Sequence, residues 1–286
     1  MDVAGSALPL PAPDLTALHG QWRDELSRVD QALDLAALRA ELSQRLLAQA
    51  GVPLETVRLE TPVPWPNKLM AFPVNYHDHA KEMASRGLAS VQGYFLKSNS
   101  SLIGASDRIE LPDLPGREIH HECEIALVIG KTCRQVSEAD ALDCIFGYAC
   151  LMDMVVRGRE ERVFRKAYDT FCPVGPWIVT ADEVADPTQL EMKLWVNGEL
   201  RQHANTRDLV LDIPGMVEMA SAVMTLYPGD IIATGTPAGV GQIRAGDQVR
   251  ITIDGLGEMN VKVVQGTEGA TPVFDKPYTP DIIKQK

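Results

Sequence analysis

The sequence is short of basic residues, of long apolar runs and of paired cysteines. Its 286 residues hold 27 Lys and Arg against 39 Asp and Glu, and this deficit argues against a nucleic-acid or membrane-surface partner, since both favour basic patches. A transmembrane helix needs roughly 18 consecutive apolar residues, and no such run occurs. The five cysteines form no C-x-x-C pair, which excludes a disulfide framework and a thiolate zinc site. Because the first residues also lack a basic secretory segment, we expect a cytoplasmic protein.

The pattern of apolar residues divides the chain into three regions. Between Asp14 and Gly51 apolar residues recur every three or four positions, which predicts amphipathic helices. Prolines 62, 64 and 66 mark a boundary, after which short apolar runs predict strands and an Asn197-Gly198 hairpin turn, with helices at 139–148 and 216–226. We therefore expect a β-rich α+β fold, with an N-terminal helical region at 1–65, a catalytic domain at 66–270 and a tail at 271–286.

Two carboxylates stand at the head of an apolar strand. Glu122 and Glu124 share one face with Ala126, because side chains alternate along a strand. Adjacent buried carboxylates repel each other and lose hydration, and a divalent cation removes both costs. The pair alone is also compatible with a solvated strand end that carries two unrelated acids.

A third carboxylate lies in another apolar run. A buried Asp153 would need a partner, which makes it a natural third ligand, although it could also cap a helix. Arg157 follows four residues later, and its planar fork suits a substrate carboxylate as well as a surface ion pair. A glycine-rich loop at 234–241 offers backbone N–H groups to an anion but is not a phosphate-binding loop.

Four of the six histidines fall in two short segments. His79 and Glu82 are three residues apart, so a helix would make them neighbours, as in a general base oriented by a carboxylate or in an ordinary surface pair. The remaining three of these histidines are predicted to serve structure or to orient ligands: His77, His120 and His121.

Further motifs occur in order between residues 66 and 265. They are Asn75-Tyr76-His77-Asp78-His79, Phe95-Leu96-Lys97, Ser101-Leu102-Ile103-Gly104, Glu122-Cys123-Glu124, Asp153 with Arg157, Asp169-Thr170-Phe171-Cys172-Pro173, Val196-Asn197-Gly198-Glu199 and Gly229-Asp230-Ile231-Ile232-Ala233-Thr234-Gly235-Thr236-Pro237. In this order they resemble the fumarylacetoacetate hydrolase superfamily, and the motifs are closest to its acylpyruvase and oxaloacetate decarboxylase branch.

The resemblance implies a mixed β-sandwich or roll with short helices, usually in a homodimer. It implies a divalent ion, Mg²⁺ with Mn²⁺ or Ca²⁺ as alternatives, and a small oxo-acid substrate. The residues that it assigns are metal ligands at Glu122, Glu124 and Asp153, catalytic groups at His79, Glu82 and Lys166, and substrate contacts at Tyr76, Lys97, Arg157 and Thr236.

The leading hypothesis is a metal-dependent hydrolase that cleaves a carbon–carbon bond in a 2,4-dioxo acid of the acylpyruvate or fumarylpyruvate type. His79, oriented by Glu82, would deprotonate the attacking water, and Lys166 or Lys97 would stabilise oxyanion charge. The alternatives are an oxaloacetate-type decarboxylase, a 2-hydroxy-dienedioate isomerase, and a non-catalytic keto-acid-binding protein. Val74 stands where the branch can carry an arginine, which argues against a small diacid such as oxaloacetate.

Overall fold

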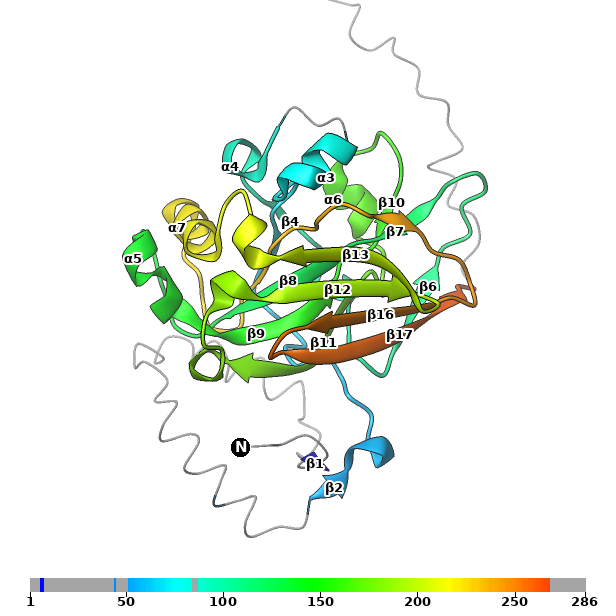
Figure 1. The fold of residues 1–286 in the computed structure, drawn as a ribbon, viewed down its shortest axis with the longest axis horizontal. Helices are drawn as coiled ribbons and strands as arrows, with labels where there is room; N and C mark the ends of the chain where they lie inside the picture. Colours follow the sequence, from blue (N-terminus) through cyan, green and yellow to red (C-terminus); the bar gives the residue numbers. More distant parts are fainter. Residues whose placement is uncertain (1–5, 8–43, 45–50, 84–86, 268–286) are drawn as a thin grey trace, which may run out of the picture.

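Two β-sheets pack face to face in the computed structural model, which describes residues 6–7, 44, 51–83 and 87–267 (Figure 1). The larger sheet has seven strands in the order β4 (Phe95–Leu96), β3 (Leu69–Ala71), β14 (Ile231–Ala233), β8 (Cys123–Ile129), β9 (Ile145–Met152), β11 (Cys172–Thr180) and β5 (Leu102–Ile103). The central strands β8 and β9 are antiparallel, and Cys123 pairs with Met152. This register puts Asp153, the next residue after β9, beside the start of β8.

The smaller of the two packed sheets has five strands. Their order is β13 (Glu199–Asn205), β12 (Glu191–Val196), β16 (Gln248–Ile253), β17 (Gly257–Gln265) and β6 (Arg108–Leu111). The β12–β13 hairpin turns at Asn197 and Gly198, whose φ angles are 51° and 82°. A two-residue hairpin with a type I′ turn has positive φ at both positions, so the predicted turn is confirmed.

A third sheet of three strands links the ends of the first two. It consists of β10 (Val155–Val156), β7 (Ile119–His121) and β15 (Gly241–Gln242), and a separate pair joins β1 (Ser6–Ala7) to β2 (Val52–Pro53). Because β7 runs directly into β8 and β10 follows Asp153, this sheet sets the position of the predicted metal ligands.

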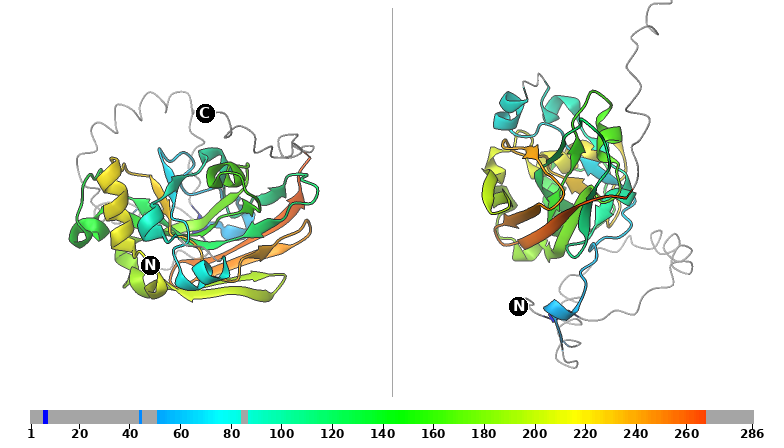
Figure 2. Two further views of the ribbon diagram at one scale, coloured as in Figure 1. Left: turned by 90° about the horizontal axis from the view of Figure 1, so that it is seen from above. Right: turned by 90° about the vertical axis from the view of Figure 1, so that its right-hand side faces the viewer.

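The described helices are short and lie outside the sheets (Figures 1 and 2). The α-helices are α3 (His77–Glu82), α4 (Ala89–Gln92), α5 (Glu138–Ala141), α6 (Arg162–Lys166) and α7 (Ile213–Val223), and single 3₁₀ turns occur at Leu54–Thr56, Asn99–Ser101, Leu142–Cys144, Ala181–Glu183, Pro187–Gln189 and Thr206–Asp208. Within the described residues, no helix has the length and apolar character needed to cross a membrane.

The main core lies between the two large sheets. From β8 it receives Cys123, Ile125, Leu127 and Ile129, and from the facing sheet it receives alternate residues of β12 and β16. Ala126 packs instead in a second cluster on the opposite face of the large sheet. The alternation expected along this strand is thus observed, and it places Glu124 on the face away from the main core.

One predicted helix is wrong in its second half. The stretch 139–148 is helical only to Ala141, with a 3₁₀ turn to Cys144, and Ile145 already begins β9. An apolar run of this length does not distinguish a buried strand from a buried helix, and pairing with β8 and β11 decides it. The predicted N-terminal helices and the tail at 271–286 lie outside the described residues.

Candidate active site

Three buried carboxylates meet where β7, β8 and β9 come together. One oxygen from each of Glu122, Glu124 and Asp153 lies within 4.8 Å of the others. Glu122 occupies the junction between β7 and β8, and its carbonyl accepts the N–H of Asp153 at 3.0 Å. Each of the three side chains is at least nine-tenths buried. The three predicted ligands are therefore brought together by strand pairing in the centre of the fold.

The charges around the cluster fit a hard divalent cation. Burial and the neighbouring charge of Asp153 raise the pKa of Glu124 well above its ordinary value, and the N–H of Gly235, 2.8 Å from Glu124 Oε2, offsets this only in part. Three carboxylate oxygens so close together need positive charge, and carboxylate oxygens are the ligands that Mg²⁺ and Mn²⁺ prefer. The residues present thus suit the ion that the sequence predicts.

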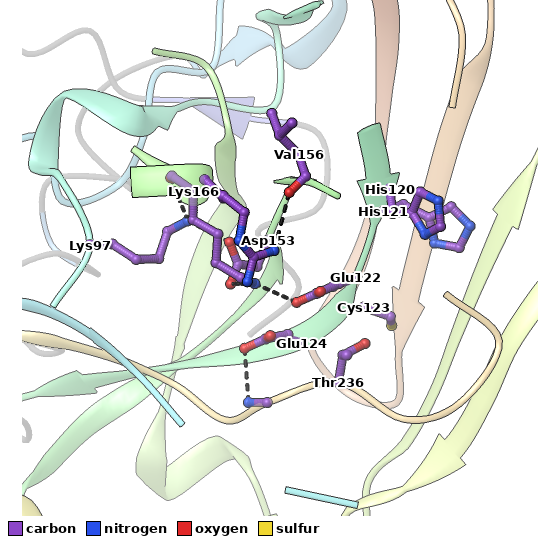
Figure 3. Close-up of polar contacts among 12 residues, drawn as sticks. Lys97, His120, His121, Glu122, Cys123, Glu124, Asp153, Val156, Lys166 and Thr236 are labelled. Carbon is purple, nitrogen blue, oxygen red and sulfur yellow. Dashed lines mark hydrogen bonds and ion pairs between the residues drawn. The ribbon is translucent and has the colours of Figure 1, made fainter. Parts of the chain in front are cut away.

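Two lysines bond to the carboxylates (Figure 3). Lys166 Nζ donates to Glu122 Oε2 at 2.6 Å and to Asp153 Oδ2 at 2.5 Å, while Lys97 Nζ forms an ion pair with Asp153 Oδ1 and donates to the Lys166 carbonyl. Burial is the largest single influence on the pKa of both Lys166 and Glu122, and by itself it disfavours their charged forms. The mutual attraction of these groups outweighs it, so the pKa of Lys166 is raised and that of Glu122 is lowered.

The predicted His–Glu pair forms on α3. His79 is buried, and its Nδ1 lies 2.9 Å from Glu82 Oε2. The other carboxylate oxygen of Glu82 accepts the N–H of Gly239 at 3.0 Å. The glycine-rich loop therefore contacts Glu124 through Gly235 and the His79–Glu82 pair through Gly239. One segment of chain thus connects this pair to the carboxylate cluster.

Among the described residues, His120 and not a carboxylate orients Arg157. Its Nε donates to His120 Nδ1 at 2.9 Å, and the opposite ring nitrogen of His120 lies 2.8 Å from Glu118 Oε2. Arg157 Nη2 contacts the sulfur of Met83, the residue that follows α3. The guanidinium is thus held at Nε by His120, and its Nη2 faces only the weak sulfur acceptor of Met83 among the described residues.

Two of the predicted substrate contacts lie in different environments. Tyr76 is packed in the main core, and its hydroxyl donates to the sulfur of Met192, so it presents no polar group to a substrate in this conformation. Thr236 is 3 % exposed and lies near Glu124 (Figure 3). Its Oγ1 accepts a hydrogen bond from Gln202 at 2.8 Å.

Gln202 is a residue that the sequence reasoning missed. It lies on β13 opposite Leu194, and that partner is in the main core. The alternation along the predicted hairpin was the available signal. Gln202 stands two positions before Ala204, which packs against the core, so the two side chains share a face of the strand.

The fold and the site together define a metal-dependent enzyme in which a His–Glu pair accompanies a buried carboxylate cluster. The family described as fumarylacetoacetate (FAA) hydrolase, C-terminal, matches residues 68–264. The chain belongs to this fumarylacetoacetate hydrolase family and, within it, to the acylpyruvase branch, as the sequence predicted. The expected class, a metal-dependent hydrolase, is likewise confirmed.

Several relatives cover most of the chain. The maleylpyruvate hydrolase of Aquipseudomonas alcaligenes is 43 % identical over 80 % of this chain and 83 % of its own length. A crystal structure of maleylpyruvate hydrolase from Sphingobium sp. SYK-6, in complex with manganese(II) and pyruvate, is 58 % identical with a TM-score of 0.77, and the match covers 92 % of this chain and 96 % of that one. The oxaloacetate tautomerase YisK of Bacillus subtilis is 37 % identical over 73 % of this chain and 74 % of its own length.

Proposed function

We propose that this protein hydrolyses an acylpyruvate whose acyl part carries a second carboxylate, of the maleylpyruvate or fumarylpyruvate type. Water adds across the carbon–carbon bond, so the products are pyruvate and a dicarboxylate. The observation that carries the proposal is the glycine-rich loop, which bonds to Glu124 at Gly235 and to Glu82 at Gly239. A decarboxylase would need the carboxylate cluster but no base that activates water, whereas hydrolysis needs both on one side of the substrate.

Glu122, Glu124 and Asp153 would hold Mg²⁺ or Mn²⁺. When bound, such an ion supplies positive charge against the negative charge that develops on the 2-oxo acid. The manganese(II) in the Sphingobium relative supports this assignment.

The chain's own groups would carry the proton and orient the substrate. His79 donates from Nδ1 to Glu82, which leaves a lone pair on Nε2 to take a proton from water. Lys166 uses two of its three N–H groups on carboxylates, and the third would meet oxyanion charge on the substrate. Arg157 and Thr236 would bind the acid ends, since a guanidinium fork and a hydroxyl both donate to carboxylates.

A product assay over a panel of oxo acids tests the proposal. Acetylpyruvate, maleylpyruvate, fumarylpyruvate and oxaloacetate would be incubated with the protein after chelation and after addition of Mn²⁺ or Mg²⁺. We expect pyruvate from the acylpyruvates only with metal, little activity in Glu122→Gln, and wild-type activity in the exposed control Glu110→Gln.

Other outcomes would replace the proposal. Carbon dioxide from oxaloacetate without pyruvate from any acylpyruvate would identify a decarboxylase. Proton exchange in D₂O without bond cleavage would identify a tautomerase or isomerase, and tight oxalate binding without any turnover would identify a binding protein.

We also propose a cytoplasmic homodimer. The five cysteines are unpaired and buried, which suits a reducing compartment. Leu96 on β4 and Val163 and Phe164 on the neighbouring α6 are each more than 40 % exposed, and exposed apolar side chains on adjacent elements favour a partner surface. Light scattering after gel filtration measures the mass, and a monomer of 31.3 kDa would contradict the dimer.

A further inference from the structure

Gln202 is a polar side chain at a core position, 1 % exposed, and it uses all of its hydrogen-bonding groups. Its Oε1 lies 3.0 Å from the N–H of Cys123 and 3.0 Å from His121 Nδ1. Its Nε2 donates to Thr236 Oγ1 at 2.8 Å and to the carbonyl of Pro237 at 2.9 Å. One side chain of β13 therefore joins the strand that carries the metal ligands to the glycine-rich loop.

The partners of Gln202 allow only one orientation of its amide. The backbone N–H of Cys123 can only donate, so it must face Oε1, and the carbonyl of Pro237 can only accept, so it must face Nε2. The same logic makes His121 Nδ1 a donor to Oε1. Thr236 Oγ1 is consequently an acceptor from Gln202, and its own hydrogen must point elsewhere.

The hydroxyl of Thr236 therefore keeps its own hydrogen free to donate. Within the described part of the chain, Thr236 Oγ1 has no other hydrogen-bond partner. The residue before it, Gly235, donates to Glu124, and the close-up shows Thr236 near that carboxylate (Figure 3). A hydroxyl that already accepts a hydrogen bond from an amide can use its own hydrogen to donate to a negatively charged ligand.

The backbone of β13 supports the loop as well. A side chain at Gly239 would place its Cβ 2.0 Å from the carbonyl oxygen of Arg201, the neighbour of Gln202. The loop thus rests directly on β13 at Gly239, the residue whose N–H donates to Glu82. Its position depends on the smaller of the two packed sheets and not only on the metal-bearing strand.

We propose that Gln202 is a positioning residue: it fixes Thr236 as a hydrogen-bond donor to the carboxylate of the bound 2-oxo acid. This rests on the proposed function for the identity of the ligand. Gln202 itself touches neither the carboxylate cluster nor the substrate, and it acts through Thr236. The competing explanation is that its four hydrogen bonds only hold the two sheets together.

A double-mutant cycle on pyruvate binding separates these explanations. Calorimetry would measure pyruvate affinity in saturating Mn²⁺, and separately Mn²⁺ affinity, for Gln202→Met, Thr236→Val and the double variant. One hydrogen bond to a charged group corresponds to roughly a 10- to 100-fold change in affinity. We expect each single variant to lose affinity for pyruvate in this range, the double variant to match Thr236→Val within about threefold, and Mn²⁺ affinity to stay within about threefold.

Matched variants control for a loss of packing. Thr206 follows the end of β13 and is buried to a similar degree as Gln202. Its hydroxyl bonds to Leu190 and Pro187 and not to the loop, and Thr206→Val removes this hydroxyl. It should lower the melting temperature and leave pyruvate affinity unchanged. Thr236→Ser keeps the hydroxyl and should retain both pyruvate affinity and its coupling to Gln202. In acylpyruvate turnover, Gln202→Met should raise KM more than it lowers kcat.

Three results would overturn the inference: additive losses in the double variant, unchanged pyruvate affinity in Gln202→Met, or an equal loss of Mn²⁺ affinity. If Gln202→Met does not fold, Gln202→Glu keeps the oxygen that faces Cys123 and replaces the donor by an acceptor, and it should weaken pyruvate binding at least as much. Wild-type protein that binds pyruvate but cleaves no acylpyruvate would contradict the proposed function and leave this cycle fully informative.

Discussion

Replacing Glu82 by glutamine should remove the general base and leave the metal site intact. The carboxylate of Glu82 bonds to His79 Nδ1 at 2.9 Å and to the N–H of Gly239 at 3.0 Å. In Glu82→Gln the amide oxygen must face Gly239, because a backbone N–H cannot pair with an NH₂ group. The NH₂ group then faces His79, whose Nδ1 must become the acceptor.

This change of tautomer sets the size of the effect. With Nδ1 accepting, the ring proton moves to Nε2, and the lone pair that would take a proton from water is lost. General-base catalysis contributes about 10²- to 10⁴-fold. The expected loss in kcat is therefore about 10²- to 10⁴-fold, or roughly 3–5 kcal/mol in activation free energy.

The assay is steady-state pyruvate release from an acylpyruvate at saturating Mn²⁺, together with calorimetric Mn²⁺ titration. Mn²⁺ affinity should stay within about threefold of wild type, because Glu82 is not one of the three clustered carboxylates. Lys81→Gln, an exposed neighbour on α3, is the matched control and should keep its kcat. A kcat for Glu82→Gln within threefold of wild type would refute the role of the pair, and a large loss of Mn²⁺ affinity would mean that Glu82 acts through the metal.

Three further predictions concern the charges, the thiols and the loop. Lys166→Met should lower the melting temperature of metal-free protein by roughly 6–12 °C, because it leaves Glu122 buried without its cation and Asp153 paired with Lys97 alone, at about 3 kcal/mol. Saturating Mn²⁺ should recover most of this loss in a thermal-shift assay, and no recovery would argue against metal binding by these carboxylates. The five buried cysteines should react with an aromatic disulfide reagent only after denaturation, since burial raises the pKa of most of these thiols, and rapid reaction of the native protein would contradict their placement. Gly239→Ala should abolish turnover with little loss of Mn²⁺ affinity, because the φ angle of Gly239 is +94° and the added Cβ would overlap the carbonyl oxygen of Arg201. Wild-type activity in this variant would show that the loop can move away from β13 at no cost.

The ligand types could be predicted from local spacing. Glu122 and Glu124 share a face because strand side chains alternate, and His79 and Glu82 meet because residues three apart are neighbours on a helix. Asp153 could be proposed because a carboxylate in an apolar run needs a partner. Each of these inferences depends on residues within a single strand, helix or apolar run, so each can be made from the sequence.

Contacts between distant elements could not be predicted in this way. The strand nature of Ile145–Met152 comes from pairing with β8 and β11, which apolar content alone does not specify. Tyr76 belongs to a motif that resembles substrate-binding segments, yet its side chain packs in the core against Met192. Gln202 and Thr236 are separated by 34 positions and meet only because the two sheets pack together.

The sequence by itself determined which chemical groups are present and which face of its own strand or helix each one occupies, because periodicity is a local property of the backbone. It specified an oxygen-rich metal site, a histidine with a carboxylate three residues away and a glycine-rich loop. Only the tertiary structure decided that this loop contacts both, that Lys166 and Lys97 supply the compensating charge, and that Gln202 donates a hydrogen bond to the Thr236 hydroxyl. Hydrogen bonds are directional and short, so their partners are chosen by the packing of whole sheets and not by neighbours along the chain.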